Sequence, residues 1–147
     1  GWARTQEAQV AEKTRDLLEF VGLSGVADLP AGKLPYGQQR LLEVARALAA
    51  EPRLLLLDEP AAGLNTQETA ALADVIERIN GRGVTVLLVE HDMSLVMKVA
   101  RRIVVIDFGR KIAEGSPAEI KVHPDVLAAY LGGTEAVADD GAEPAHA

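Results

Sequence analysis

The sequence of 147 residues contains no cysteine, and this absence excludes disulfide scaffolds, thiolate zinc sites and thiol nucleophiles. It also has no apolar run approaching the roughly 18 residues that a membrane-spanning helix needs. Its first residues do not resemble a secretory signal, although the chain begins with Gly1 rather than Met, which leaves an internal start open. We therefore expect a protein of the cytoplasm.

The sequence lacks an excess of basic residues, which argues against nucleic acid as a partner. It has 15 Lys and Arg against 22 Asp and Glu, for a formal net charge of -7, and a negative chain is not attracted to a phosphate backbone. Residues 132–147 carry acidic side chains, no Lys or Arg, and little that could be buried. We expect an acidic disordered tail there.

The hydrophobic pattern alternates between helical and strand periods, which indicates an α/β fold. Three short apolar runs are predicted to be buried parallel strands joined by right-handed crossovers: residues 54–57, 84–89 and 103–106. Amphipathic or capped segments are predicted to be helices: residues 5–20, 38–50, 65–80, 92–100, a helix after Ser116, and residues 124–131. Asn65 with Glu68 and Ser116 with Glu119 match capping boxes, and Asp92 or Ser94 can cap the helix over 92–100. The turn at Phe108-Gly109 predicts a hairpin with a short antiparallel strand at residues 111–113.

Polar residues follow two of the predicted strands directly. Asp58 and Glu59 come after the first strand, and Glu90 and His91 after the second, so all four are expected at the carboxyl edge of the sheet, where ligands of such folds gather. There Asp58 could hold a hydrated magnesium ion beside phosphates, and Glu59 could polarise water. Asp58 could equally cap the following turn, and His91 could be a core histidine.

A glycine turn leads into the second predicted helix at residues 34–39, whose sequence is Leu-Pro-Tyr-Gly-Gln-Gln. Free amide groups and the helix dipole at such a start can hold an anion. By contrast, the string G-x-x-x-x-G-K followed by Ser or Thr, which forms a phosphate-binding loop, does not occur in the sequence. The chain is therefore expected to carry only half of a nucleotide site.

Taken in order, these motifs resemble those of the ATPase subunits of ABC transporters. Residues 34–39 are similar to the signature motif, and residues 54–59 are similar to the Walker B strand. Residues 62–65 are similar to the D-loop, and His91 is similar to the switch histidine. The resemblance covers residues 1–131 and only the C-terminal part of the family's nucleotide-binding domain. It implies a P-loop NTPase fold, with a helical signature segment over 1–50 and a Walker B and switch-histidine core with a terminal helix over 51–131.

The resemblance also implies residue roles in binding and hydrolysing ATP. Glu59 would orient or deprotonate the attacking water, His91 would contact the γ-phosphate, and Asp58 would hold Mg²⁺. The remaining site residues would contact nucleotide across a head-to-tail dimer with a second ATPase subunit: Pro35, Tyr36, Gly37, Gln38 and Asn65. Pro35 stands where the family usually has serine and offers neither a hydroxyl nor an amide proton, and Asn65 replaces the D-loop aspartate.

Within the family, Tyr36 and residues 58–65, 90–93 and 124–132 are most similar to the branched-chain amino-acid importers. The intact parent would then hydrolyse ATP under integral membrane permease subunits, as a peripheral protein on the cytoplasmic side of the membrane, whereas the isolated chain is expected to be inactive. A non-catalytic dimerisation or interaction fragment stays open, as does the ATPase of a urea- or lipid-transporting ABC system.

One strand of the family's sheet is missing from the sequence. The resemblance places the strand that leads into the phosphate loop between the counterparts of residues 84–89 and 103–106. Without it, the backbone groups of two apolar strands would be left unpaired. We expect these strands either to pair with each other or to borrow a strand from another copy of the chain.

Overall fold

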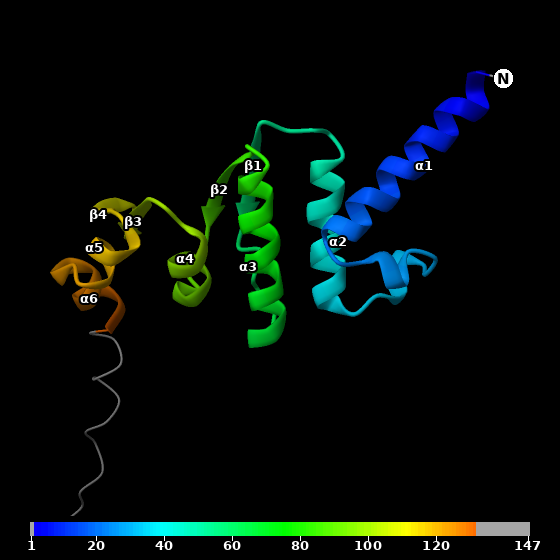
Figure 1. Cartoon of the computed structure of the whole chain (residues 1–147). Helices are drawn as coiled ribbons and strands as arrows, with labels where there is room; N and C mark the ends of the chain where they lie inside the picture. The colour runs from blue at the N-terminus through cyan, green and yellow to red at the C-terminus, as the bar shows by residue number, and fades with distance from the viewer. Residues whose placement is uncertain (1, 132–147) are drawn as a thin grey trace, which may run out of the picture. The chain divides into compact units, whose positions relative to one another are not determined.

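The computed structural model describes residues 2–131, and contacts divide the chain into two compact units, Gly1–Val99 and Ala100–Ala147. The described part of the first unit runs from α1 (Trp2–Phe20) to α4 (Met93–Val99), and that of the second from β3 (Ile103–Asp107) to α6 (Pro124–Leu131) (Figure 1). The tail predicted over residues 132–147 lies outside the described residues. None of the helices within residues 2–131 has the length and apolar character needed to cross a bilayer.

The first unit opens with a helical segment. α1 is followed by two short 3-10 helices, η1 (Ser24–Val26) and η2 (Ala31–Lys33), and by α2 (Tyr36–Leu48). α1 ends where Gly22 takes a φ of 81° and the N–H of Leu23 donates to the carbonyl oxygen of Leu18 at 2.7 Å. This hydrogen bond and the left-handed glycine are typical of a helix C-terminus. Both predicted helices of this segment are confirmed, and both begin earlier than expected.

A two-stranded parallel sheet and the helices around it form the core of the first unit. β1 (Leu54–Asp58) and β2 (Thr85–Val89) pair in register from Leu54 opposite Thr85 to Asp58 opposite Val89. The connecting helix α3 (Thr66–Gly81) lies along the strands (Figure 1) and buries its apolar face against them and against the ends of α1 and α2. The largest fully buried side chains of this core are Val21, Leu23, Leu72, Val75, Ile79 and Leu95.

The strands of this sheet are buried on one face only, so the prediction of strands buried on both faces is wrong here. Leu55 is 5% exposed and belongs to the core, whereas its neighbours Leu54 and Leu56 are 51% and 64% exposed. On the second strand, Leu87 and Val89 are 56% and 55% exposed. Because alternate residues of a strand point to opposite faces, these four side chains form one open apolar face.

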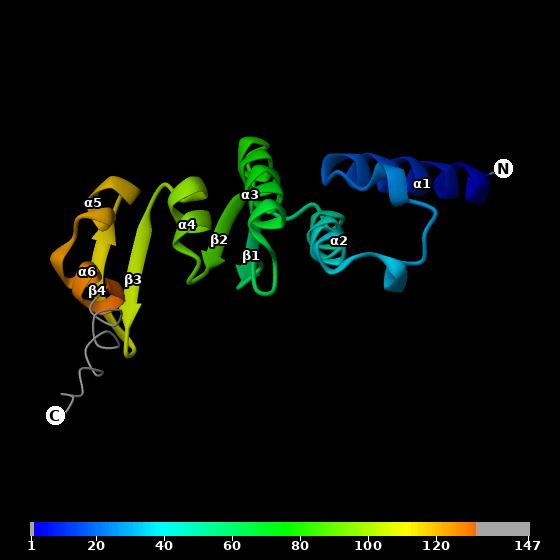
Figure 2. The ribbon, with the colours of Figure 1, turned by 90° about the horizontal axis from the view of Figure 1, so that it is seen from below.

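The second unit is a hairpin packed against two short helices. β3 pairs antiparallel with β4 (Arg110–Gly115), with an irregular register between Val105 and Ile106. α5 (Pro117–Lys121) and α6 both contact β4 (Figure 2), and the buried hydrophobic side chains among the described residues of this unit are Ile103, Val105, Ala113, Ile120 and Val126. The connecting turn uses positive φ values at Phe108 and Gly109, as tight hairpin turns require. The predicted hairpin is confirmed, and its second strand is longer than expected.

The third predicted parallel strand behaves differently from the other two. Among the described residues, β2 pairs only with β1 and β3 pairs only with β4. The antiparallel pairing of β3 with β4 is the predicted hairpin, whereas a parallel pairing of β3 within the sheet stays a prediction, as does a pairing of β2 with β3. The borrowing of a strand from another copy stays a prediction.

Candidate functional site

The two strand ends of the first unit bring Glu59 and His91 together. Glu59 follows β1 directly and its N–H donates to the carbonyl oxygen of Val89 at 2.8 Å, which ties it to the end of β2. Nδ1 of His91 lies 3.4 Å from Oε1 of Glu59, and both side chains are largely exposed. His91 is therefore not a core histidine, and the predicted meeting of polar residues at this edge is confirmed.

The backbone of Glu59 is held in an unusual conformation. Its φ is 45°, in the left-handed region that L-residues other than glycine, Asn and Asp seldom adopt. Such a conformation persists only where the surrounding contacts impose it, and it is found most often at functional sites. Here the hydrogen bond to Val89 fixes the residue on its N-terminal side.

Glu90 lies behind the exposed pair, and sequence reasoning assigned it no role. Its side chain is 1% exposed. One carboxylate oxygen accepts a hydrogen bond from Ala61 N at 2.9 Å, and the other accepts from His91 N at 2.9 Å and from Asp92 N at 3.0 Å. The only signal in the sequence is an acidic residue directly after an apolar strand, which does not distinguish a buried carboxylate from an exposed one.

Asp92 fixes the other side of the His91 loop. Its Oδ1 accepts hydrogen bonds from the N–H of Ser94 at 2.9 Å and of Leu95 at 3.1 Å, which caps the start of α4. A hydrogen bond from the Ser94 hydroxyl, followed by the one from Leu95 N–H, lowers the pKa of the Asp92 carboxyl below its usual value, against a smaller opposing effect of burial. The predicted capping of this short helix is confirmed.

Asp58 is the last residue of β1, and it is exposed beside Glu59. Within residues 2–131, no group of three or more His, Cys, Asp or Glu side chains is arranged to hold a metal ion by itself. A single exposed carboxylate nevertheless fits Mg²⁺, because this ion keeps several waters and is commonly bound by one or two carboxylates together with phosphate oxygens.

The predicted anion-binding turn forms the start of α2. Pro35 precedes the helix with extended backbone and gives it no side-chain cap. The Gln39 side chain donates to the carbonyl oxygen of Leu34 at 2.9 Å, whereas Oε1 of Gln38 is buried without a hydrogen-bond partner among the described residues. The first turn of α2 therefore keeps backbone donors at a positive helix end.

The start of α2 packs closely against the segment that follows β1. A Cβ atom added to Gly63 would lie 3.0 Å from Cε1 of Tyr36, and one added to Gly37 would lie 2.6 Å from Oε1 of Glu68. The Tyr36 hydroxyl in turn accepts a hydrogen bond from Nε of Arg40 at 2.9 Å. The two glycines thus allow Tyr36 and Glu68 to bring the signature-like and D-loop-like segments into contact.

Asn65 caps α3 through a complete capping box. Its Oδ1 accepts a hydrogen bond from Glu68 N at 2.8 Å, and the Glu68 carboxylate accepts one from Asn65 N at 3.0 Å. The capping pattern predicted from the sequence is confirmed here, and the same pattern is confirmed at Ser116 and Glu119 for α5. The side-chain oxygen of Asn65 is therefore already engaged within the chain.

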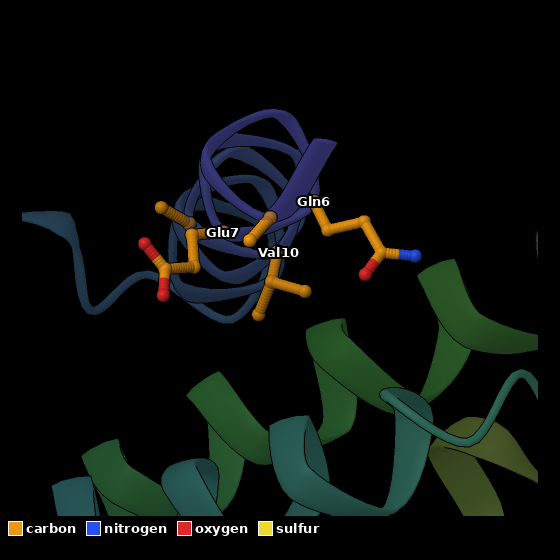
Figure 3. Close-up of a pocket in the computed structure, with 5 residues that line it drawn as sticks. Gln6, Glu7 and Val10 are labelled. Carbon is orange, nitrogen blue, oxygen red and sulfur yellow. The ribbon is translucent and has the colours of Figure 1, made fainter. Parts of the chain in front are cut away.

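Two other concave regions of the first unit lack the predicted site residues. A depression on α1 is lined by Ala3, Gln6, Glu7, Val10 and Ala11, and Figure 3 shows Gln6, Glu7 and Val10 projecting from this one helix. A groove between the ends of α1, α2 and α3 includes Pro52 and Val84, which precede the two strands. The groove therefore lies at the opposite end of the strands from Glu59 and His91.

Comparison with known families identifies the chain. Residues 2–62 match the family model described as ABC transporter, and residues 110–136 match the one described as branched-chain amino acid ATP-binding cassette transporter. The chain belongs to the ABC transporter ATP-binding family. The predicted resemblance to this family is thereby confirmed, and nucleotide binding is a property of this family.

Curated members of the ABC transporter family show extended similarity to the chain. The branched-chain amino acid transport ATP-binding protein BraF of Pseudomonas aeruginosa is 49% identical over 130 residues, which cover 88% of this chain and 51% of BraF. LivG of Escherichia coli, with the same description, is 44% identical over the same shares. The methionine import ATP-binding protein MetN of Bradyrhizobium diazoefficiens is 39% identical over 125 residues, which cover 84% of this chain and 35% of MetN.

Solved ABC transporter structures show the same fold. The ADP conformation of the ATP-binding cassette MJ1267 superposes with a TM-score of 0.76 at 31% identity, over 84% of this chain and 50% of that one. The transporter component cbiO1 of Clostridium perfringens gives a TM-score of 0.73 at 26% identity, over 87% and 53%. The predicted α/β, P-loop-type ABC ATPase fold is confirmed, and the chain spans about half the length of BraF, LivG and these two structures.

Proposed function

We propose that this chain is part of the ATP-hydrolysing subunit of an ABC importer for branched-chain amino acids. The 3.4 Å approach of His91 to Glu59 carries the proposal, because a carboxylate and an imidazole meet where two parallel strands end. Similarity to BraF and LivG supports the solute class. Residues 1–131 would be the C-terminal part of a nucleotide-binding domain, with a helical signature segment over 1–50 and the Walker B and switch-histidine core over 51–131.

The exposed residues at the strand ends would carry the hydrolytic step. Glu59 would orient the attacking water and accept its proton, and His91 would donate a hydrogen bond to the γ-phosphate from the nitrogen that does not face Glu59. Asp58 would hold Mg²⁺, which neutralises charge on the phosphates when bound. The hydrogen bond between Glu59 N–H and the Val89 carbonyl oxygen supports this division, because it ties the backbone of Glu59 to the end of β2, from which the His91 loop starts.

The start of α2 would serve a nucleotide held by a second ATPase subunit in a head-to-tail dimer. Backbone donors of Tyr36, Gly37 and Gln38 at the positive end of the helix are suited to phosphate oxygens, whereas Pro35 contributes no donor. Asn65 would lie at the same dimer contact. Integral membrane permease subunits would complete the importer, with the chain as a peripheral protein on the cytoplasmic side of the membrane.

A second function, a non-catalytic dimerisation or interaction fragment, is favoured by one specific observation. The 147 residues contain no G-x-x-x-x-G-K-[ST] string, so the chain has no loop of its own to cradle phosphates. In that case the contact between the start of α2 and the turn after β1 would serve association alone.

A chimera tests these functions against each other. The half of BraF that matches this chain is replaced by residues 1–131, and ATP turnover is measured together with that of the Glu59→Gln and His91→Ala variants. We expect turnover in the chimera, a loss of about 100-fold or more in Glu59→Gln with nucleotide binding retained, and a loss of roughly tenfold or more in His91→Ala. Asp74→Asn, which removes an exposed ion pair with Lys98, is the control.

Two results would contradict the catalytic proposal. A folded chimera that binds ATP without turnover would favour the non-catalytic fragment. A Glu59→Gln chimera with the turnover of the unsubstituted one would remove Glu59 from the role of base.

A further inference from the structure

Glu90 combines deep burial with three backbone hydrogen bonds, unlike the exposed carboxylates beside it. Its side chain is 1% exposed, whereas that of Glu59 is 54% exposed. The three donors come from two segments that are far apart in the sequence: Ala61 from the turn after β1, and His91 and Asp92 from the loop after β2. Glu90 is thus a bridge between these two segments.

The bridge needs both oxygens of a carboxylate. Oε1 takes the hydrogen bond from Ala61, and Oε2 takes those from His91 and Asp92. A buried charge is strongly unfavourable unless hydrogen bonds compensate it, and N–H donors to a carboxylate are stronger than those to a neutral acceptor. A side-chain amide of the same shape has only one acceptor oxygen, so it can serve one segment and would turn N–H donors toward the other.

The two bridged segments carry the candidate catalytic side chains. Ala61 is two residues after Glu59, and His91 follows Glu90 directly. Nδ1 of His91 lies 3.9 Å from Oε2 of Glu90 and 3.4 Å from Oε1 of Glu59, so the buried and the exposed carboxylate both approach the same imidazole nitrogen. The left-handed backbone of Glu59 is held on its N-terminal side by the hydrogen bond from its own N–H to Val89. On its C-terminal side it is held by the hydrogen bond from Ala61 N–H to Glu90.

We propose that Glu90 is a positioning residue that holds Glu59 and His91 at a fixed separation by joining the Ala61 turn to the His91 loop. The bridge itself is independent of ATP. Its effect on turnover rests on the proposed function. Two measurements therefore distinguish a failure of the bridge from a failure of the proposed function.

The first measurement is amide hydrogen exchange by NMR on the 147-residue chain. In Glu90→Ala, we expect the amides of Ala61, His91 and Asp92 to exchange about tenfold faster or more, with the amides of α3 unchanged. In Glu90→Gln, either Ala61 or the other two amides lose protection, because one acceptor oxygen remains. Asp74→Asn is the control for loss of a carboxylate in the same unit.

The exchange data can also contradict the bridge. Unchanged exchange at all three amides in Glu90→Ala would overturn it. If Glu90→Ala does not fold, the Gln variant of similar shape decides alone: selective loss on one side supports the bridge, and unchanged exchange on both sides overturns it.

The second measurement is ATP turnover in the BraF chimera. We expect Glu90→Gln to lower kcat roughly tenfold or more with KM for ATP within about twofold, because misplaced catalytic groups slow the reaction without weakening binding. A purely structural role would reduce the folded fraction or change KM and kcat together. A Glu90→Gln chimera with unchanged kcat would overturn the positioning role, whereas an unsubstituted chimera without turnover would contradict the proposed function and leave the exchange result to decide on the bridge.

Discussion

Tyr36 lies directly against Gly63, because a Cβ atom added to that glycine would be 3.0 Å from Cε1 of the ring. Gly63 also takes a φ of 78°, so a side chain there would meet both a contact and an unfavourable backbone conformation. The tyrosine at the start of α2 and the turn after β1 are thereby kept at contact distance.

This contact predicts that an alanine at position 63 destabilises the protein more than an alanine at position 83. Gly83 has a φ of 88° with nothing within 4 Å of an added Cβ, so Gly83→Ala is expected to lose about 1 kcal/mol for its backbone alone. Gly63→Ala should lose more, because Tyr36 must also move. Urea unfolding of the two variants measures the difference, and equal losses would show that the Tyr36 contact contributes nothing to stability.

The left-handed backbone of Glu59 predicts that glycine is tolerated better than alanine at this position. At a φ of 45°, Glu59→Gly relieves an unfavourable conformation that Glu59→Ala retains. We expect the glycine variant to be more stable than the alanine variant by about 1 kcal/mol in chemical denaturation, although both lose the carboxylate. A more stable alanine variant would mean that the chain rearranges around residue 59.

The hairpin of the second unit is expected to lose stability in acid. Lys111 and Arg102 both donate to the Glu114 carboxylate, and these contacts lower its pKa from 4.5 to about 2. Because the folded-state pKa lies below the unfolded one, the stabilisation is complete above about pH 4.5 and disappears as the pH falls toward 2.

Variants test this acid sensitivity directly. Glu114→Gln should flatten the pH dependence of hairpin unfolding in that range, and Lys111→Met should reduce it. NMR signals of β3 and β4 followed from neutral pH to pH 2 provide the measurement. Identical profiles for the Gln variant and the unsubstituted chain would assign the acid sensitivity to other groups.

Nucleotide affinity is expected to be poor for the 147-residue chain alone. Asp58 and Glu59 cannot replace the loop amides and the lysine of a phosphate-binding loop, because two carboxylates repel the phosphates that those groups attract. Calorimetric titration with MgATP should therefore give no saturable binding in the micromolar range. Micromolar affinity would reveal a phosphate cradle that the sequence does not contain.

Local sequence patterns predicted the helices and their caps well, because the interactions that form them are short-range. The box between Asn65 and Glu68 joins residues three apart, so its pattern is visible in the sequence and its hydrogen bonds are present in the structure. The meeting of Glu59 and His91 was also predictable, since both follow strands that end at the same edge.

Features that depend on residues far apart in the sequence could not be predicted from local sequence patterns. The run at residues 54–57 is apolar throughout, which is typical of a strand covered on both sides, but half of its side chains lie on the open face. Whether a covering layer is present depends on other segments and not on the run itself. The role of Glu90 depends on Ala61, 29 residues earlier in the sequence, and no spacing rule connects the two.

The open face of β1 and β2 has a consequence for the lifetime of such a chain in a cell. Leu54, Leu56, Leu87 and Val89 form an apolar surface beside strand edges that pair with no further strand among the described residues. Chaperones and proteases of misfolded proteins bind such surfaces. A polypeptide with this surface uncovered would persist according to how fast it is captured, degraded or aggregated, rather than according to its free energy of unfolding. Its abundance should therefore rise when a covering layer is supplied, even if its own fold is unchanged.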